Sequence, residues 1–501
     1  MKIQKFFISL PADEDHSPGL RERISVYVLV LIPWTLVYEL FVALGIPPDA
    51  VIAYLPFEQH IPIIEWTEVV YAATYIFVTL VPLVAATSRI LREFSITALF
   101  SIVVMSLLFI IFPFIAPPRE FVPQGFLGRL LLFERNYDTA AAAFPSYHVV
   151  WAIISARALA QSFPHKKLLW WLIALLITVS CITTSMHALV DVVAGAVMGF
   201  LFLHYKPIWA WIRSLTERIA NSRREKIIGP VRIINIGIYT GLAGGIGILI
   251  CGTLLGSGNI CNILLIAFSA LIMAGLWGYI FGIFSAPLRA YGYYGSVIGV
   301  FLGVLLARLC GGSMWLLLAA FAVAGPAVQV IGRLSCLVQG CCYGHEAPPS
   351  IGIRYQHPHS QVCRSTNLAG VPLHPTPLYS ILWNMILAII LGRLWSLHVD
   401  TTLIAGLYLI LSGLGRFIEE FFRGDPQIFV LSKFRLNQLM AIISVIAGAL
   451  IMIANSGQKP PEPNFNFLTV IVAILFGLIT FFTMGIDFPN STRPFARVSD
   501  K

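Results

Sequence analysis

Residues 94–116 read FSITALFSIVVMSLLFIIFPFIA, a stretch that carries no charged side chain. The hydrocarbon core of a bilayer is about 30 Å thick, and a helix of about 20 apolar residues crosses it. This stretch is long enough to do so. Because it is continuously apolar and does not alternate in polarity, it predicts a membrane helix and not a strand of a membrane barrel.

The rest of the chain repeats this pattern. Hydrophobic residues make up 58% of its 501 residues and charged residues 11%, which excludes a soluble globular protein. We therefore predict an all-α, polytopic protein of a bacterial plasma membrane, with about 13–14 transmembrane helices in two helical-bundle domains. The predicted spans are 24–45, 66–87, 94–116, 147–163, 168–186, 190–205, 233–255, 259–284, 293–311, 313–331, 376–393, 402–421, 437–455 and 467–486.

A polar stretch, residues 206–232, separates two series of spans and is rich in Lys and Arg. Such residues concentrate in cytoplasmic loops. We therefore predict a first membrane domain at 1–205, a basic cytoplasmic linker at 206–232, and a second membrane domain at 233–501 with an extra C-terminal span. The same loop bias explains the net charge of +9 without a nucleic-acid partner.

The first six spans predict one consistent orientation. Arg89, Arg92, Lys166 and Lys167 mark further cytoplasmic loops. With the N-terminus inside, the loops before spans four and six face outward. The motifs FPSYHVVW, at 144–151, and SMHALVD lie in these loops, so we expect them on the extracytoplasmic side.

These two motifs combine residues suited to phosphoryl chemistry. Titratable groups are costly at membrane depth and mark functional sites. Ser146 and His148 open a span, where free backbone N–H groups and the helix dipole favour an anion. His187 and Asp191 are four residues apart on one helix face, so the carboxylate can orient an imidazole nucleophile. His148 is then placed to protonate a departing oxygen, and Arg119 to neutralise phosphate charge.

The segments APPR at 116–119, PSYH at 145–148 and HALVD at 187–191 resemble the three motifs of the type 2 phosphatidic acid phosphatase superfamily, above all its inositolphosphotransferase-like branch. The resemblance covers about residues 25–205. It implies that the later histidine is the phosphorylated nucleophile and the earlier one the general acid. The roles it implies are His187 as nucleophile, His148 as acid, Asp191 as orienter, and Ser146 and Arg119 as phosphate ligands.

Two positions depart from that family's pattern. Cys181 stands where many members have an arginine, and Tyr147 replaces the glycine of the second motif. Phosphate binding is therefore expected to involve Arg129 or, in our assignment, Arg135 in the same outer loop. The alternative is that these His and Asp side chains only hydrogen-bond helices to one another.

The second domain carries three further motifs at helix ends: IGRLSCLVQGCCYGH, at 331–345, LHPTPLY and GRFIEEFFRGD. Arg333, Arg416, Glu420 and Arg423 are ionisable groups beside apolar spans, which an anionic lipid headgroup would satisfy. The alternative is an internal network in which Glu420 pairs with Arg416 and Arg423 at i,i+4 and i,i+3 spacing.

These motifs resemble prolipoprotein diacylglyceryl transferase, which moves diacylglyceryl from phosphatidylglycerol to a lipobox cysteine. The resemblance spans roughly residues 233–455 and includes Arg333, Gly340, Gly344, Arg416 and Glu420. It implies that the arginines bind the lipid headgroup, together with the residue that aligns with the family's catalytic histidine. That residue is Tyr294 here, and the family's Asn and Glu become Cys336 and Cys341. This family begins outside the membrane whereas the linker places the domain's start inside, so the sidedness of the second domain stays open.

A group of cysteines, Cys336, Cys341, Cys342 and Cys363, lies near His345 in this motif. A disulfide, free thiols and a zinc site are all compatible with the sequence. Adjacent cysteines are not expected to chelate one ion together easily, so we assign no metal site and no cofactor.

Two classes of function are compatible with these patterns. In the first, the chain is a bifunctional lipid enzyme: a phosphatase or phosphotransferase acting on a membrane phospholipid or lipid phosphate, fused to a diacylglyceryl transferase-like domain with a lipoprotein or other acceptor. In the second, the C-terminal domain only binds lipid or docks a partner. A transporter is disfavoured because paired broken helices are not evident.

Overall fold

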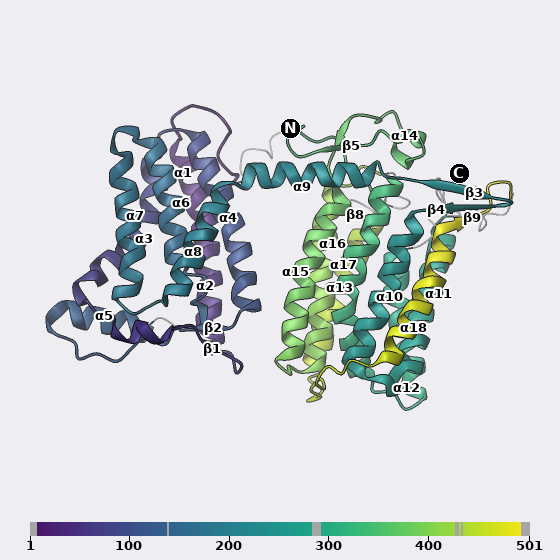
Figure 1. The fold of residues 1–501 in the computed structure, drawn as a ribbon. Helices are drawn as coiled ribbons and strands as arrows, with labels where there is room; N and C mark the ends of the chain where they lie inside the picture. The colour runs from purple at the N-terminus through teal and green to yellow at the C-terminus, as the bar shows by residue number, and fades with distance from the viewer. Residues whose placement is uncertain (1–7, 138–139, 283–291, 426–429, 432–433, 492–501) are drawn as a thin grey trace. The chain divides into compact units, whose positions relative to one another are not determined.

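The computed structural model of the chain divides into two compact units, Met1–Ile208 and Trp209–Lys501 (Figure 1). We call them unit 1 and unit 2. The structure describes residues 8–137, 140–282, 292–425, 430–431 and 434–491.

Helices dominate both units. Among the described residues, 11 helices are long and apolar enough to cross a membrane, and a bent pair, Leu189–Leu203 with Tyr205–Ala220, would make a twelfth. Tyr293–Leu309 is a shorter apolar helix. Each predicted span contains a helix. The prediction of an all-α polytopic membrane protein is therefore confirmed.

Unit 1 is built around one helix that is buried over most of its surface. This helix, α6, packs against α3, α4, α7 and α8, and most of its residues are buried; its one charged side chain outside the histidine site, Arg157, is exposed. The helices of unit 1 are α1 (Leu20–Val26), continued by a π-helical turn (Tyr27–Leu31) into α2 (Ile32–Leu44), α3 (Glu68–Val84), α4 (Ser88–Ile111), α5 (Gly125–Tyr137), α6 (Tyr147–Ser162), α7 (Lys167–Thr183) and α8 (Leu189–Leu203). Strands β1 (Val51–Ile52) and β2 (Phe114–Ile115) pair in parallel.

Two glycines on α8 allow close contact with α6. A Cβ on Gly195 would lie 2.5 Å from the carbonyl oxygen of Ser146, and one on Gly199 would lie 2.8 Å from Ile153 Cδ1. Small residues four apart are the usual device by which membrane helices approach each other. Here they bring the start of α6 against the first turns of α8.

Unit 2 has α13 at its centre, in contact with α10, α12, α15 and α16. Three helix pairs complete the bundle: α10 with α18, α11 with α12, and α16 with α17. The elements are α9 (Tyr205–Ala220, which begins in unit 1), β3 (Glu225–Ile228), β4 (Val231–Ile234), α10 (Ile236–Leu255), α11 (Ile260–Gly282), α12 (Tyr293–Leu309), α13 (Met314–Gln339), β5 (Ile353–Arg354), α14 (Gln361–Ser365), β6 (Pro372–Leu373), α15 (Thr376–Ser396), α16 (Thr401–Phe422), β7 (Val430–Leu431), β8 (Phe434–Arg435), α17 (Leu436–Ile453), α18 (Phe467–Gly485) and β9 (Ile486–Asp487).

The basic stretch 206–232 forms helix α9 and most of the β3–β4 hairpin. The part in unit 2 packs on the polar loop that follows α13. Trp209 Nε1 donates to the carbonyl oxygen of Ser350 at 3.0 Å, and the backbone N–H of Arg354 donates to Glu217 at 3.1 Å. The loop after α13 and the basic stretch therefore lie at the same end of unit 2.

The first and last spans of unit 2 lie side by side. Strand β9, which follows α18, pairs with β4, which precedes α10. A Cβ on Gly237 would lie 2.8 Å from the Cα of Gly485. Arg232 donates to both carboxylate oxygens of Asp487, at 2.8 and 2.7 Å, and both side chains are buried. A buried bidentate pair thus joins the two ends of the unit.

We expect Asp487→Ala to destabilise unit 2 by about 3–5 kcal/mol, because it leaves the guanidinium of Arg232 buried without its bidentate partner. The measurement is the melting temperature in detergent. Asp13→Ala is the control: Asp13 and Arg89 form an ion pair whose side chains are 70% and 47% exposed, so its loss should change stability by about 0–1 kcal/mol. Equal melting temperatures for both variants would contradict this account.

Candidate functional sites

The predicted histidines and aspartate of unit 1 come together where α6 and α8 begin. His187 Nδ1 lies 3.8 Å from Asp191 Oδ2, and both residues are buried. Asp191 Oδ2 also accepts the backbone N–H of Ala188 at 2.9 Å, which fixes the carboxylate in the first turn of α8. The carboxylate therefore faces one imidazole nitrogen and leaves the other directed away from it.

That other nitrogen, His187 Nε2, lies 3.4 Å from His148 Nδ1. The hydroxyl of Tyr71 lies 3.1 Å from the same His148 nitrogen, and the two rings stack with their centroids 4.2 Å apart. Tyr71 is fully buried on α3. It is a site residue that sequence reasoning missed, because a tyrosine on an apolar helix face gives no signal of its own.

The contact between the two histidines limits what can bind between them. A phosphorus atom about 3 Å from one nitrogen, with its leaving oxygen about 3 Å from the other, needs more room than the 3.4 Å observed between the nitrogens. A phosphoryl group can enter only if the imidazoles separate. The ring of His148 contacts the side chain of Tyr71, whereas His187 belongs to the turn that precedes α8.

Ser146 is the N-cap of α6, but its hydroxyl makes no cap hydrogen bond. Its Oγ is 4.0 Å from Cys181 Sγ, and its backbone N–H donates to the carbonyl oxygen of Asp191 at 2.9 Å. The residue is fully buried. The backbone of Ser146 thus joins the two motifs, and its hydroxyl is held only by a weak contact to sulfur.

Arg119 is tied to the backbone of the outer loops. Its NH1 donates to the carbonyl oxygens of Glu58, Gln59 and Ile61 at 2.9, 3.2 and 2.6 Å, and its Nε to Ser185 Oγ at 2.9 Å. Ser185 is two residues before His187 and has a positive φ of 54°. Arg119 therefore stabilises the turn that carries the histidine.

Arg135, on α5, also stabilises the turn that carries His187. It donates to the carbonyl oxygen of Arg119 at 2.7 Å and to that of Thr184, and its guanidinium lies 4.5 Å over the ring of Phe121. Burial lowers the pKa of Arg135. Arg129, the other arginine considered in this loop, is exposed.

Glu58 is a second residue that sequence reasoning missed. It is 2% exposed, and its carboxylate accepts the backbone N–H groups of Leu55 and Leu189, each at 2.6 Å. The second bond caps the start of α8, where a negative charge is favoured by the helix dipole. Its only sequence signal is an acidic residue in an apolar outer loop.

Unit 2 encloses a cavity of about 490 Å³ between its helices. Apolar residues of α10, α11, α12 and α13 line much of it, and polar residues gather where α13 and α16 end and α17 begins. The polar lining residues include Arg333, Cys336, Cys341, Cys342, Arg416, Arg423, Tyr293, Tyr294 and Asn437. A cavity with an apolar body and a charged end suits an amphipathic ligand.

The arginines at this end pair with Glu419 and not with Glu420. Arg416 NH1 donates to both oxygens of Glu419 at 2.9 Å, and Arg423 NH1 lies 3.7 Å from Glu419. Arg423 also holds Asp425 through two bonds of 2.6 Å. The alternative of an internal ion network is therefore observed with Glu419, and not Glu420, as the acid that lies near both arginines.

Glu420 instead faces α17. Its carboxylate accepts Asn437 Nδ2 at 3.4 and 3.2 Å and lies 3.9 Å from Arg435. The carbonyl oxygen of Asn437 accepts the hydroxyl of Tyr294 at 3.1 Å, so Glu420 and Tyr294 are linked through one residue.

Arg333 is 6% exposed and lines the cavity. Arg416 and Arg423 each donate hydrogen bonds to a carboxylate, and the Nε of Arg416, like that of Arg333, has no partner among the described residues. Glu419 attracts Arg333 electrostatically. A buried guanidinium with an unused donor is costly unless a ligand supplies an acceptor.

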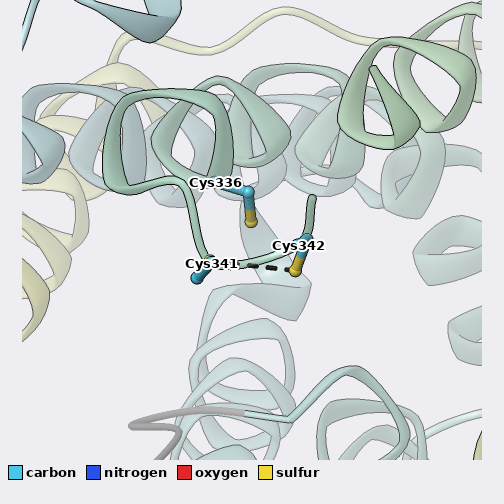
Figure 2. Close-up of side chains that lie close together, drawn as sticks. All are labelled: Cys336, Cys341 and Cys342. Atoms are coloured by element: carbon cyan, nitrogen blue, oxygen red, sulfur yellow. Dashed lines mark hydrogen bonds between the residues drawn. The ribbon is translucent and has the colours of Figure 1, made fainter. Parts of the chain in front are cut away.

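Cys336, Cys341 and Cys342 lie together at the end of α13, with their sulfur atoms within 4.8 Å of one another (Figure 2). All eight cysteines are free thiols. Cys363 is outside the group; its Sγ lies 3.4 Å from the carbonyl oxygen of Tyr355. Hydrogen bonds from Cys336 and Cys341 hold the pKa of Cys342 well below its ordinary value.

Comparisons with known proteins divide the chain at the same place as the motifs. Residues 36–204 match the sequence model of the PAP2 superfamily, and residues 226–454 match that of prolipoprotein diacylglyceryl transferase. The two halves resemble two different families. Both resemblances noted from the sequence are thereby confirmed.

Individual relatives match the C-terminal half. A phosphatidylglycerol–prolipoprotein diacylglyceryl transferase 2 of Clostridium perfringens is 35% identical over 171 residues, which cover 33% of this chain and 63% of the relative. The corresponding transferase of Clostridium tetani is 32% identical over 161 residues, 32% of this chain and 61% of the relative. The chain thus spans less than two thirds of the length of these relatives.

Proposed function

We propose that the chain is a bifunctional membrane lipid enzyme. Unit 1 is a histidine-dependent phosphatase or phosphotransferase that acts on a phospholipid or lipid phosphate. Unit 2 transfers a diacylglyceryl group from phosphatidylglycerol or a related lipid to a lipoprotein or other acceptor. The observation that carries the first activity is the placement of His187 between Asp191 and His148. The second rests on Arg333, which lines the cavity of unit 2 and whose Nε has no hydrogen-bond partner in the described part of the chain.

In unit 1, Asp191 faces His187 Nδ1 at 3.8 Å, and a small shift would bring them into a hydrogen bond that leaves the Nε2 lone pair for phosphorus. The P–O bond to the leaving group breaks as the N–P bond forms, and His148 gives a proton to the departing oxygen. Water or an alcohol then takes the phosphoryl group from His187 while His148 accepts its proton. Water makes the unit a phosphatase, and an alcohol makes it a phosphotransferase.

Ser146, Arg119 and Arg135 remain the proposed phosphate-binding residues. The hydroxyl of Ser146 has no strong hydrogen bond to give up. The two arginines donate to backbone carbonyl oxygens. Phosphate must therefore replace some of these hydrogen bonds, or be attracted by the arginine charges from a longer distance.

The site of unit 1 is proposed to face the extracytoplasmic side. His148 is at the start of α6 and His187 precedes α8, whereas Lys166 follows the end of α6 and Arg89 begins α4. The histidines and these cations therefore lie at opposite ends of the helices. Cationic loops are retained in the cytoplasm.

In unit 2, Arg333 and Arg416 are proposed to bind the phosphate of the lipid headgroup, with Arg423, Glu420 and Tyr294 shaping the polar end. The binding-module alternative is favoured by one observation. The hydroxyl of Tyr294 is engaged by the Asn437 carbonyl and stands where the resembled family has its catalytic histidine, so it is not placed to act as a base.

We expect His187→Ala to abolish turnover by unit 1, because it removes the nucleophile. The purified protein is incubated in detergent with phosphatidic acid, phosphatidylglycerol phosphate, phosphatidylinositol or isoprenyl pyrophosphate, and free phosphate and new lipids are measured. His165→Ala, in an exposed turn, should retain full activity. Unchanged turnover in His187→Ala would remove this residue from the mechanism.

Tyr71→Phe should lower the same activity roughly tenfold or more, since a hydrogen bond to a group that becomes charged is worth about 1.5–3 kcal/mol. Tyr75→Phe is the matched control: its ring also contacts His148, at 5.7 Å between centroids, but its hydroxyl faces Glu134. An unchanged kcat in Tyr71→Phe, or an equal loss in Tyr75→Phe, would contradict a specific role of the Tyr71 hydroxyl.

Arg333→Gln should reduce diacylglyceryl transfer and the retention of phosphatidylglycerol through purification about tenfold or more, because a charged hydrogen bond to phosphate is lost. Arg308→Gln is the control, since Arg308 is exposed near the end of α12. If Arg333→Gln no longer retains phosphatidylglycerol and the unmodified protein shows no transfer activity, the result favours a C-terminal domain that only binds lipid. Full retention in Arg333→Gln would contradict both versions.

A further inference from the structure

The three cysteines are brought together by a turn that the sequence specifies. Gly340 ends α13 with a positive φ of 68°, and its N–H returns to the carbonyl oxygens of Cys336 and Leu337 at 2.9 and 3.3 Å. This left-handed cap reverses the chain. It brings the next two residues, Cys341 and Cys342, back toward Cys336. Figure 2 shows the Cys336 sulfur directed toward the loop that carries the other two.

The returning loop is fixed on both sides. The Thr376 hydroxyl donates to the carbonyl oxygen of Cys342, and the N–H of His345 donates to that of Phe422 at 3.0 Å. A Cβ on Gly344 would lie 2.5 Å from the carbonyl oxygen of His374. The sulfur atoms are therefore held by a supported backbone and not by an isolated loop.

The distances between the sulfur atoms suit a shared metal ion. Tetrahedral Zn²⁺ with Zn–S bonds of about 2.3 Å places its sulfur ligands about 3.8 Å apart. Cys341 Sγ and Cys342 Sγ are 3.7 Å apart, and all three sulfur atoms lie within 4.8 Å. An adjustment of at most about 1 Å completes the geometry. The two adjacent sulfur atoms are therefore close enough to contact one ion, although adjacent cysteines are not expected to chelate one easily.

We propose that Cys336, Cys341 and Cys342 form a three-thiolate site for Zn²⁺ or a similar soft divalent ion, with the fourth coordination position open toward the cavity of unit 2. All three residues line that cavity. Three protein ligands and one open position distinguish reactive zinc sites from closed structural ones.

The charges around the site support this assignment. Three thiolates and one Zn²⁺ carry a net charge of −1, which a cation must balance in a buried place. Arg333 lies three residues before Cys336 on α13, and both Arg333 and Arg423 line the same cavity as the three cysteines. The two arginines thus offset the excess charge of a loaded site.

A cytoplasmic location of this loop, which we infer from its contacts with the basic stretch, would keep its thiols reduced. The loop after α13 packs on the basic stretch that begins unit 2, and a basic stretch is favoured on the cytoplasmic side. Cysteines in that compartment remain thiols and are free to bind metal.

The open coordination position would allow the metal to activate a substrate thiol. This inference rests on the proposed function of unit 2. The cysteine thiol of an acceptor bound at the open position would release its proton to solvent. Its sulfur would then form a bond to the glyceryl carbon of the lipid donor as the C–O bond to phosphate breaks, and the headgroup phosphate would leave with that oxygen. The metal would supply the activation that Tyr294 does not provide.

The first test is metal analysis of the full chain purified without chelator. We expect about one zinc per chain, and Co²⁺ substitution should give the thiolate charge-transfer and tetrahedral bands of a cysteine-ligated ion. Cys336→Ser and Cys342→Ser should lose at least nine tenths of the bound metal. Cys363→Ser and Cys310→Ser, outside the cluster, should keep it.

Thiol labelling tests the site without a variant. In the unmodified protein, bound zinc should protect Cys336, Cys341 and Cys342 from alkylation, and a chelator should expose all three while Cys363 labelling stays the same. A protein that takes up neither Zn²⁺ nor Co²⁺ with these thiols free, or one in which peptide mapping finds a disulfide among them, overturns the proposal.

The open position is tested on the Co²⁺ form with a short peptide containing one cysteine and with its serine counterpart. The cysteine peptide alone should shift the charge-transfer band. An unchanged spectrum overturns the open position but not the three-thiolate site. Metal binding with no transfer of diacylglyceryl in any assay refutes the proposed function of unit 2 and leaves the metal site standing.

Discussion

Arg423 is the cation on which the polar end of unit 2 depends. It is 1% exposed, holds Asp425 through two short bonds and lies 3.7 Å from Glu419. Its carbonyl oxygen accepts Arg435, and the next N–H, that of Gly424, pairs with Tyr343 in the cysteine-bearing loop. Because a buried charge must be paired, one arginine fixes the end of α16, the start of α17 and the loop after α13.

The same constraint acts on unit 1 with different residues. There the buried charge is the carboxylate of Asp191, which is held by the N–H of Ala188 and by the positive end of α8. Both units therefore place the polar groups of their candidate sites where a helix begins or ends. Only there do free backbone groups meet titratable side chains without interrupting a span.

The sequence predicts the helices well, because a continuous apolar run has few other solutions in a membrane. It also predicts that His187 and Asp191 share a helix face, since four-residue spacing is a local property. Contacts made across the fold carry no such signal. The contact of the Tyr71 hydroxyl with His148 and the capping of α8 by Glu58 join segments that are far apart in the chain. Which of Glu419 and Glu420 pairs with the arginines depends on how α16 is rotated against α13.

The pairing of β4 with β9 places the start of the first span of unit 2, α10, beside the end of its last span, α18. A bundle whose first and last spans are adjacent can be attached to another domain through either one without rearranging its helices. Joining a second membrane domain ahead of α10 therefore requires no new connection inside the bundle. The same property should make the bundle from α10 to α18 tolerant of circular permutation, with β4 and β9 joined by a short loop.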